Sequence, residues 1–225
     1  MINTIIFDID GTLLNGEIAV YKSMFQTIKE LEGKEYKLED HPFVVGQDYE
    51  ESLAQFGVKD IEAAMKRWNE LYMSMVKEIV LFDGIEELLK TLKKEGYTLG
   101  VVTSRYKYGY DEAIENHNLK GYFDYYVCAD DTVNNKPDSE PMHHFLMISG
   151  KKASECLYIG DTLYDEMCAR GANVAFGVVE WGALSLEGFR TNIIFRKPQD
   201  VLLWLKKLKT QYKILRRKRW ISRKN

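Results

Sequence analysis

Short apolar runs alternate along the chain with longer stretches in which apolar residues recur every three to four positions. The runs that are typical of buried strands are 4–7, 97–103, 125–129, 156–159, 174–178 and 192–195. Between most of them the spacing is helical, as in Ile85, Leu88, Leu89 and Leu92 before Gly96. This alternation predicts an α/β fold, a parallel sheet flanked by helices, in which ligands bind at the carboxyl ends of the strands.

One segment departs from this alternation. Between the first two predicted strands, over roughly residues 15–82, every apolar pattern is helical, with one stripe at 18–31 and another at 61–79. A βαβ crossover requires a single helix, so the excess predicts an inserted all-helical domain. The expected organisation is an α/β core of residues 1–14 and 83–205, a helical domain of residues 15–82, and a basic tail of residues 206–225.

Composition narrows the class of protein. The 225 residues are 45% hydrophobic and 12% aromatic with only 4 Pro, which is typical of a folded chain and not of a disordered one. The three cysteines form no CxxC pair, which favours a reducing compartment. No uncharged stretch reaches the ~18 residues that a membrane span requires, and the first residues lack a basic leader region. We therefore expect a cytoplasmic protein.

The net charge of −3 conceals a strong asymmetry. Residues 206–225 hold ten Lys and Arg and no acid, which leaves 21 basic and 34 acidic side chains in the remainder. An acidic core argues against nucleic-acid binding by that core. The tail has two interpretations: a weak contact with a polyanion such as RNA or an anionic membrane, or a continued solvated helix that returns to the acidic core. We favour the second.

The first predicted strand ends in two closely spaced carboxylates. Asp8 and Asp10 lie on one face of an extended chain, where two negative charges need a cation or a raised pKa. Gly11 permits a tight turn and leaves backbone N–H groups free for an anion. On its own, this pattern is also typical of a turn that caps a strand.

Three further sites carry polar residues. Thr103 and Ser104 follow the second strand, Lys136 precedes Pro137 at a predicted helix start, and Asp161 with Asp165 follows the fourth strand. Each feature alone is common, because hydroxyls and carboxylates cap helices and lysines lie on surfaces. Together they gather acids, hydroxyls and a lysine at one edge of the sheet, which predicts a catalytic site.

At these residues the chain resembles the haloacid dehalogenase superfamily of aspartyl-nucleophile phosphatases. The segments that match its four motifs, in order, are 7–13, 101–104, 136–137 and 160–165. The helical insertion resembles the cap of the phosphoglycolate phosphatase and sugar-phosphate mutase branch. The resemblance implies a Rossmann-like core with a helical cap, covers residues 1–205, and leaves monomer and homodimer open.

The resemblance also implies a role for each residue. Asp8 is expected to form an aspartyl-phosphate, and Asp10, with a raised pKa, to act as general acid and base. Magnesium is expected at Asp8, the Asp10 carbonyl and Asp161, with Asp165 binding it directly, through water, or positioning Lys136 instead. Lys136 supplies a fixed cation, and the groups expected to hold phosphate are Thr103, Ser104 and Gly11.

The reaction and the substrate leave alternatives. Asp10 favours a phosphate ester or anhydride, because a halide leaves without a proton. The sugar-phosphate mutases of the branch that the chain resembles carry a histidine soon after the first motif, so the absence of His from residues 13–24 disfavours a mutase. We predict a phosphatase that acts on a small phosphorylated metabolite. A pyrophosphatase, a mutase and a non-catalytic binding protein on the same fold remain as alternatives.

The leaving group is expected to meet a loop of the helical insertion. The candidate loop is Gly46, Gln47, Asp48 and Tyr49, which offers no cation. Arg105 and Lys107, just past the second strand, could supply one from the core, although for both a solvated position is favoured.

Overall fold

The computed structural model describes residues 1–37, 49–75 and 79–222, with the backbone alone at 17, 18 and 215–222. Its centre is a parallel six-stranded sheet of order β3-β2-β1-β4-β5-β6. The strands are β1 (Thr4–Phe7), β2 (Thr98–Val102), β3 (Tyr125–Val127), β4 (Cys156–Gly160), β5 (Ala175–Val179) and β6 (Ile194–Phe195). The predicted α/β class is confirmed, and each predicted strand overlaps an observed one.

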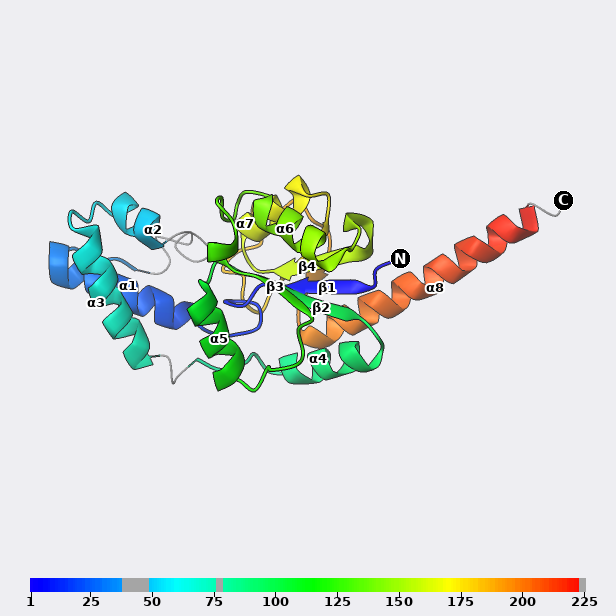
Figure 1. Ribbon diagram of the computed structural model, residues 1–225, viewed down its shortest axis with the longest axis horizontal. Coiled ribbons are helices and arrows are strands. Elements are labelled where there is room, and N and C mark those ends of the chain that lie inside the picture. The colour runs from blue at the N-terminus through cyan, green and yellow to red at the C-terminus, as the bar shows by residue number, and fades with distance from the viewer. Residues whose placement is uncertain (38–48, 76–78, 223–225) are drawn as a thin grey trace.

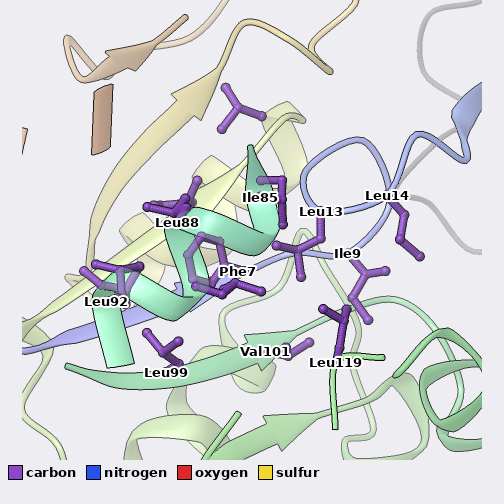
Figure 2. Close-up of a cluster of buried hydrophobic side chains, with 14 of the residues drawn as sticks. Phe7, Ile9, Leu13, Leu14, Ile85, Leu88, Leu92, Leu99, Val101 and Leu119 are labelled. Carbon is purple, nitrogen blue, oxygen red and sulfur yellow. The ribbon is translucent and has the colours of Figure 1, made fainter. Parts of the chain in front are cut away.

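Helices cover both faces of the sheet (Figure 1). They are α4 (Ile85–Lys94), α5 (Lys107–Asn116), α6 (Glu140–Ser149), α7 (Leu163–Gly171) and α8 (Pro198–Ser222), with short 3₁₀ turns η3 (Ala129–Asp131) and η4 (Ala153–Glu155). Successive side chains of β1 point to opposite faces of the sheet, as in any strand. Ile5 and Phe7 pack with α4 and α8, as Figure 2 shows for Phe7, Leu88 and Leu92. Ile6 packs with α6 and α7.

In the described part of the chain between β1 and α4 lie three helices: α1 (Glu17–Glu32), α2 (Tyr49–Gln55) and α3 (Ile61–Met75). They form a hydrophobic cluster of their own around Met24, Leu53 and Trp68. Figure 1 places them beyond the carboxyl end of β1, where ligands of a parallel sheet bind. The predicted boundaries of a separate helical domain stay a prediction. The stripe expected to run through Ile79 is shorter, since α3 ends at Met75 and Ile79 packs into the core with Leu14.

The basic tail continues the last core helix without a break. α8 buries Val201 and Leu205, and Lys209 forms an ion pair of 3.0 Å with Glu95. Beyond that point the helix extends away from the sheet, on the side opposite α1, α2 and α3 (Figure 1). In the described ranges 1–37, 49–75 and 79–222, no helix combines the length and apolar composition needed to cross a membrane.

Candidate active site

The two predicted carboxylates lie at the centre of the sheet's carboxyl edge. β1 has β2 on one side and β4 on the other, and the Asp8 amide extends the pairing by donating to the Ile159 carbonyl (2.9 Å). Asp8 and Asp10 are only 4% and 8% exposed. Gly11 then turns the chain at φ +72°, a conformation that L side chains rarely adopt. The local sequence thus buries two acids side by side where the chain leaves the sheet.

Lys136 contacts the first of these acids. Its ammonium donates to Asp8 Oδ1 at 3.0 Å, to Asp165 Oδ1 at 2.7 Å and to the Tyr158 hydroxyl at 3.3 Å. All four residues are at most 5% exposed. Lys136 lies in a loop before α6 and not at a helix start as the sequence suggested, because the proline in the first turn of α6 is Pro141.

Asp165 serves both the helix and the lysine. It is the third residue of α7 in a capping box: its amide donates to Thr162 Oγ1, and its Oδ2 accepts from the Thr162 amide at 3.0 Å. Oδ2 also accepts from the Thr162 hydroxyl, while Oδ1 accepts from Lys136 and from the Tyr158 hydroxyl. These four hydrogen bonds use about four acceptor positions, which is the full capacity of a carboxylate.

Burial and charge set the ionisation of this group. Burial raises the pKa of Asp8 to about 7, against the positive charge of Lys136 and with the help of the Asp165 and Asp10 carboxylates. Burial acts on Asp165 in the same direction, but Lys136 and the hydrogen bonds from Thr162 and Tyr158 outweigh it, so the pKa of Asp165 is lowered. Burial disfavours charged Lys136, yet its two acidic partners raise its pKa.

Three buried acids have the chemistry of a metal site. One carboxylate oxygen from each of Asp8, Asp161 and Asp165 lies within 4.8 Å of the others. Hard carboxylate oxygens are the ligands that magnesium and other hard divalent cations prefer. Asp161 is held in place by the Thr12 hydroxyl, which donates to its Oδ1 at 2.7 Å. The donor set therefore fits a divalent metal ion.

The second predicted motif lies beside the acids on β2. The Thr103 amide donates to the Val127 carbonyl (3.0 Å), and the Thr103 hydroxyl accepts from the Arg105 amide (3.1 Å). Thr103 is 4% exposed, and Ser104 lines a cavity of about 40 Å³ together with Tyr49. The structure thus brings Asp8, Asp10, Gly11, Thr103, Ser104, Lys136, Asp161 and Asp165 to one edge of the sheet.

Arg105 is not solvated, contrary to the favoured interpretation of the sequence. Its guanidinium binds Asp10 through two hydrogen bonds, from Nε to Oδ2 at 2.7 Å and from Nη2 to Oδ1 at 2.6 Å. Nη2 also donates to the Tyr72 hydroxyl on α3 at 3.0 Å, and Nη1 to the Gly109 carbonyl at 3.2 Å. The Arg105 charge is therefore already paired with Asp10. Lys107, in contrast, is partly exposed and pairs with Asp111.

The loop expected to meet the leaving group is only partly described, since Gly46, Gln47 and Asp48 lie outside the described residues. Tyr49 opens α2 and packs against Trp68, with ring centroids 4.6 Å apart. Trp68 in turn stacks on Tyr72, the partner of Arg105. A larger hollow of about 640 Å³ lies between α2 and the Lys136 loop, lined by Glu51, Gln55, Asn135, Lys136 and Tyr164. Its volume suits a small-molecule ligand.

Some residues of the site were missed by sequence reasoning. Tyr158, whose hydroxyl contacts Lys136 and Asp165, lies inside an apolar strand, where a tyrosine is indistinguishable from a core residue. Trp181 follows β5, and its indole N–H donates to the Thr12 carbonyl at 3.0 Å. Its only signal was its position, since it follows a predicted strand at the edge where the other polar residues gather.

Comparison with known proteins agrees with this geometry. Residues 5–179 match the haloacid dehalogenase-like hydrolase family. That match spans all four motif segments, and the chain belongs to this family. The prediction of a haloacid dehalogenase-like hydrolase is therefore confirmed.

Individual relatives extend over nearly the whole chain. Pyrophosphatase PpaX of Bacillus cereus is 27% identical over 205 residues, which cover 89% of this chain and 95% of the relative. A candidate phosphoglycolate phosphatase from Lactobacillus plantarum superposes with a TM-score of 0.81 at 26% identity, covering 90% of this chain and 98% of its own. A haloacid dehalogenase-like hydrolase from Streptococcus pneumoniae gives 0.79 at 25% identity, covering 91% and 98%.

Proposed function

We propose that the protein is a magnesium-dependent phosphohydrolase that cleaves the phosphate monoester of a small metabolite through an aspartyl-phosphate on Asp8. The observation that carries the proposal is the buried contact of Lys136 with Asp8 and Asp165, with Asp161 beside it. A carboxylate, a fixed ammonium and further acids at one strand edge are what phosphoryl transfer to an aspartate requires. The names of the Bacillus and Lactobacillus relatives support a phosphate substrate.

In this proposal Asp8 is the nucleophile. Its carboxylate oxygen attacks phosphorus, and the bond from phosphorus to the leaving oxygen breaks. Both Asp10 oxygens accept from Arg105 in the structure, so one of them must leave the guanidinium and take up a proton before Asp10 gives that proton to the leaving oxygen. Asp10 then takes a proton from water, which attacks the phosphorus of the aspartyl-phosphate and regenerates Asp8. The side chains of Asp8 and Asp10 are only 6% and 11% exposed, so few water molecules compete for the reacting groups.

Lys136 and the β2 residues hold the phosphoryl group. The ammonium of Lys136 lies 3.0 Å from Asp8 Oδ1, so it can bind both the nucleophile and an oxygen of the phosphate. Thr103 and Ser104 donate from the neighbouring strand end. The Gly11 amide, which the sequence suggested for this role, donates to the Leu14 carbonyl at 2.9 Å instead. Because these donors are fixed before the substrate arrives, they need no reorganisation during the reaction.

Asp8, the Asp10 carbonyl and Asp161 would hold the magnesium ion. The ion would supply positive charge against the charge that develops on the phosphoryl oxygens. The hydrogen bonds of Asp165 favour a different role for this residue, because both of its oxygens are occupied by Lys136, Tyr158 and Thr162. Asp165 thus positions Lys136 and stays outside the direct ligand set.

Pyrophosphate hydrolysis is the second candidate. The observation that favours it is the 27% identity to pyrophosphatase PpaX of Bacillus cereus over nearly the whole chain. The same nucleophile, acid and metal ligands would serve an anhydride, because only the leaving group changes.

Phosphate release with magnesium tests the proposal. The panel contains phosphoglycolate, pyrophosphate, sugar phosphates, nucleoside monophosphates and nitrophenyl phosphate, and the blank is Asp8→Asn, which is nearly isosteric. We expect turnover by the wild type and by the control Asp111→Asn, an exposed acid outside the site, and no turnover by Asp8→Asn. Turnover by Asp8→Asn, or release that persists when magnesium is chelated, would refute the proposal.

A further inference from the structure

We infer that Trp181 and Gly182, in the turn after β5, are positioning residues that hold the nucleophile loop in its working geometry. This inference rests on the proposed function, since it concerns how that loop is kept in place. Its basis is a direct contact between two segments about 170 residues apart, for which neither the motifs nor the family match assigns a role.

The contact involves both residues of the turn. The Trp181 indole N–H donates to the Thr12 carbonyl at 3.0 Å, while the ring packs against the core cluster of the α4 face. Gly182 approaches even more closely: a Cβ built on it would lie 1.6 Å from the Gly11 carbonyl oxygen and 2.6 Å from its carbon. Only a glycine permits this approach, because the obstacle is backbone and not the end of a flexible side chain.

The loop held in this way carries the site. Gly11 and Thr12 directly follow Asp10, so a shift of their backbone moves the carbonyl and side chain of the proposed acid. The Thr12 hydroxyl also donates to Asp161 Oδ1 at 2.7 Å and is fully buried. Thr12 therefore ties together the ends of three strands: its own after β1, Asp161 after β4 and Trp181 after β5. Since β4 lies between β1 and β5, the turn reaches across the proposed metal ligand.

Two effects follow from this arrangement. Displacing the loop should lower kcat, because an error of about 1 Å in the position of reacting groups can cost about 100-fold in rate. It should also weaken metal binding, because loss of the partner that orients a ligand costs about 10- to 100-fold in affinity. The KM for the phosphate ester should change little, since Thr103, Ser104 and Lys136 lie on other segments.

Two variants separate the contact from general packing. Trp181→Phe removes the N–H donor and keeps an aromatic ring, and Gly182→Ala forces the Gly11 carbonyl to move. Trp204→Phe is the matched control for the first. Trp204 lies in α8, away from the site, and packs on Phe195 of β6. Gly177→Ala is the control for the second, because Gly177 lies in β5, before the turn, where a Cβ would meet the Phe195 ring at 2.5 Å.

The experiment measures kcat, KM and, in the full-length protein without substrate, Mn²⁺ affinity by electron paramagnetic resonance. We expect kcat to fall about tenfold in Trp181→Phe and about 100-fold in Gly182→Ala, with KM within about threefold. Mn²⁺ affinity should fall about tenfold in both, and neither control should change it. Should Gly182→Ala fail to fold, Trp181→Phe carries the test.

The outcomes distinguish this inference from the proposed function. Variants whose kcat and Mn²⁺ affinity equal those of their controls would overturn the role of the turn while phosphatase activity stands. A wild type without turnover on any substrate would refute the proposed function, and Mn²⁺ binding would still decide whether the turn holds the loop.

Discussion

At the scale of single residues, the centre of the site is a buried charge pair with an extra acid. Lys136 lies between Asp8 and Asp165, and the three side chains are at most 6% exposed. Removing one partner from such a group costs about 3–5 kcal/mol, because it leaves an uncompensated buried charge. The hydrogen bonds of Asp165 favour its ionised form, so the cost of burying a second negative charge falls on Asp8, whose pKa is raised to about 7. A bound cation would lower this cost by favouring ionised Asp8.

The raised pKa of Asp8 predicts how the stability of the metal-free protein depends on pH. Its folded-state pKa of about 7 exceeds its unfolded value near 3.9, so between these values the folded state binds more protons. The free energy of unfolding therefore falls as pH rises from about 4 to 7. Asp8→Asn, which cannot ionise, should lack this loss and gain stability relative to wild type over that range.

Thermal unfolding at pH 5 and pH 8 in a chelating buffer measures the effect, and added magnesium should abolish it in the wild type. Asp111→Asn is the control and should follow the wild type at both pH values. A difference between Asp8→Asn and wild type that is the same at both pH values would contradict the assigned pKa.

The pairing of Arg105 with Asp10 predicts a dependence on the leaving group. Arg105→Lys keeps the positive charge but loses the planar fork that binds both Asp10 oxygens. If Asp10 protonates the leaving oxygen, displacing the Asp10 side chain should lower kcat most for an alkyl phosphate, because that leaving group needs a proton. We expect kcat to fall at least about tenfold for an alkyl phosphate and at most about threefold for nitrophenyl phosphate.

The matched control for this comparison is Lys107→Arg, at a partly exposed ion pair on the next helix. This variant should leave kcat unchanged for both substrates. Equal losses on the two substrates would show that Arg105 acts through binding or folding and not through the acid.

At the scale of elements, the start of α7 connects helix stability to the site. Thr162 is the N-cap of α7, and its hydroxyl is bonded to both the amide and the carboxylate of Asp165. The same acid then orients Lys136 across the strand end. A helix cap and the proposed catalytic lysine therefore depend on one carboxylate, which is a physical reason for an aspartate at this helix position.

Thr162→Ala tests this connection. Loss of an N-cap hydroxyl costs about 1 kcal/mol of stability, and the freed Asp165 should hold Lys136 less firmly, so kcat should fall as well. Thr210→Ala, which removes an exposed hydroxyl bonded within α8, is the control and should leave kcat unchanged. Chemical denaturation and phosphate release measure the two effects, and a stability loss with wild-type kcat would separate the cap from the site.

At the scale of the whole molecule, apolar periodicity predicted the secondary-structure elements and not the contacts between distant residues. Six strands and most of the core helices follow from apolar periodicity, and the polar strand ends place most of the candidate site at one edge. The pairing of Arg105 with Asp10 and of Trp181 with Thr12 could not be predicted, because these partners are 95 and 169 residues apart. Such contacts depend on how strands order in the sheet, which periodicity does not specify.

The last helix shows the same limit. The sequence indicated a basic tail from residue 206, and the structure places its first part in α8, a single helix from Pro198 through Ser222. Its first turns pack on the core through Val201 and Leu205, and Lys209 reaches Glu95. The continued helix agrees with the favoured interpretation, but it returns to the acidic core only at its beginning. A polyanion contact by the tail stays a prediction.

The most direct test of the central claim is to trap the phosphorylated enzyme. Wild-type protein mixed with its best substrate and magnesium is quenched in acid within one turnover, digested and analysed by mass spectrometry. Phosphorylation of Asp8 is the predicted result, with loss of the group on treatment with hydroxylamine and no such species in Asp8→Asn. Turnover without a phosphorylated peptide, or with the phosphoryl group on another residue, would contradict the assignment of Asp8 as the nucleophile.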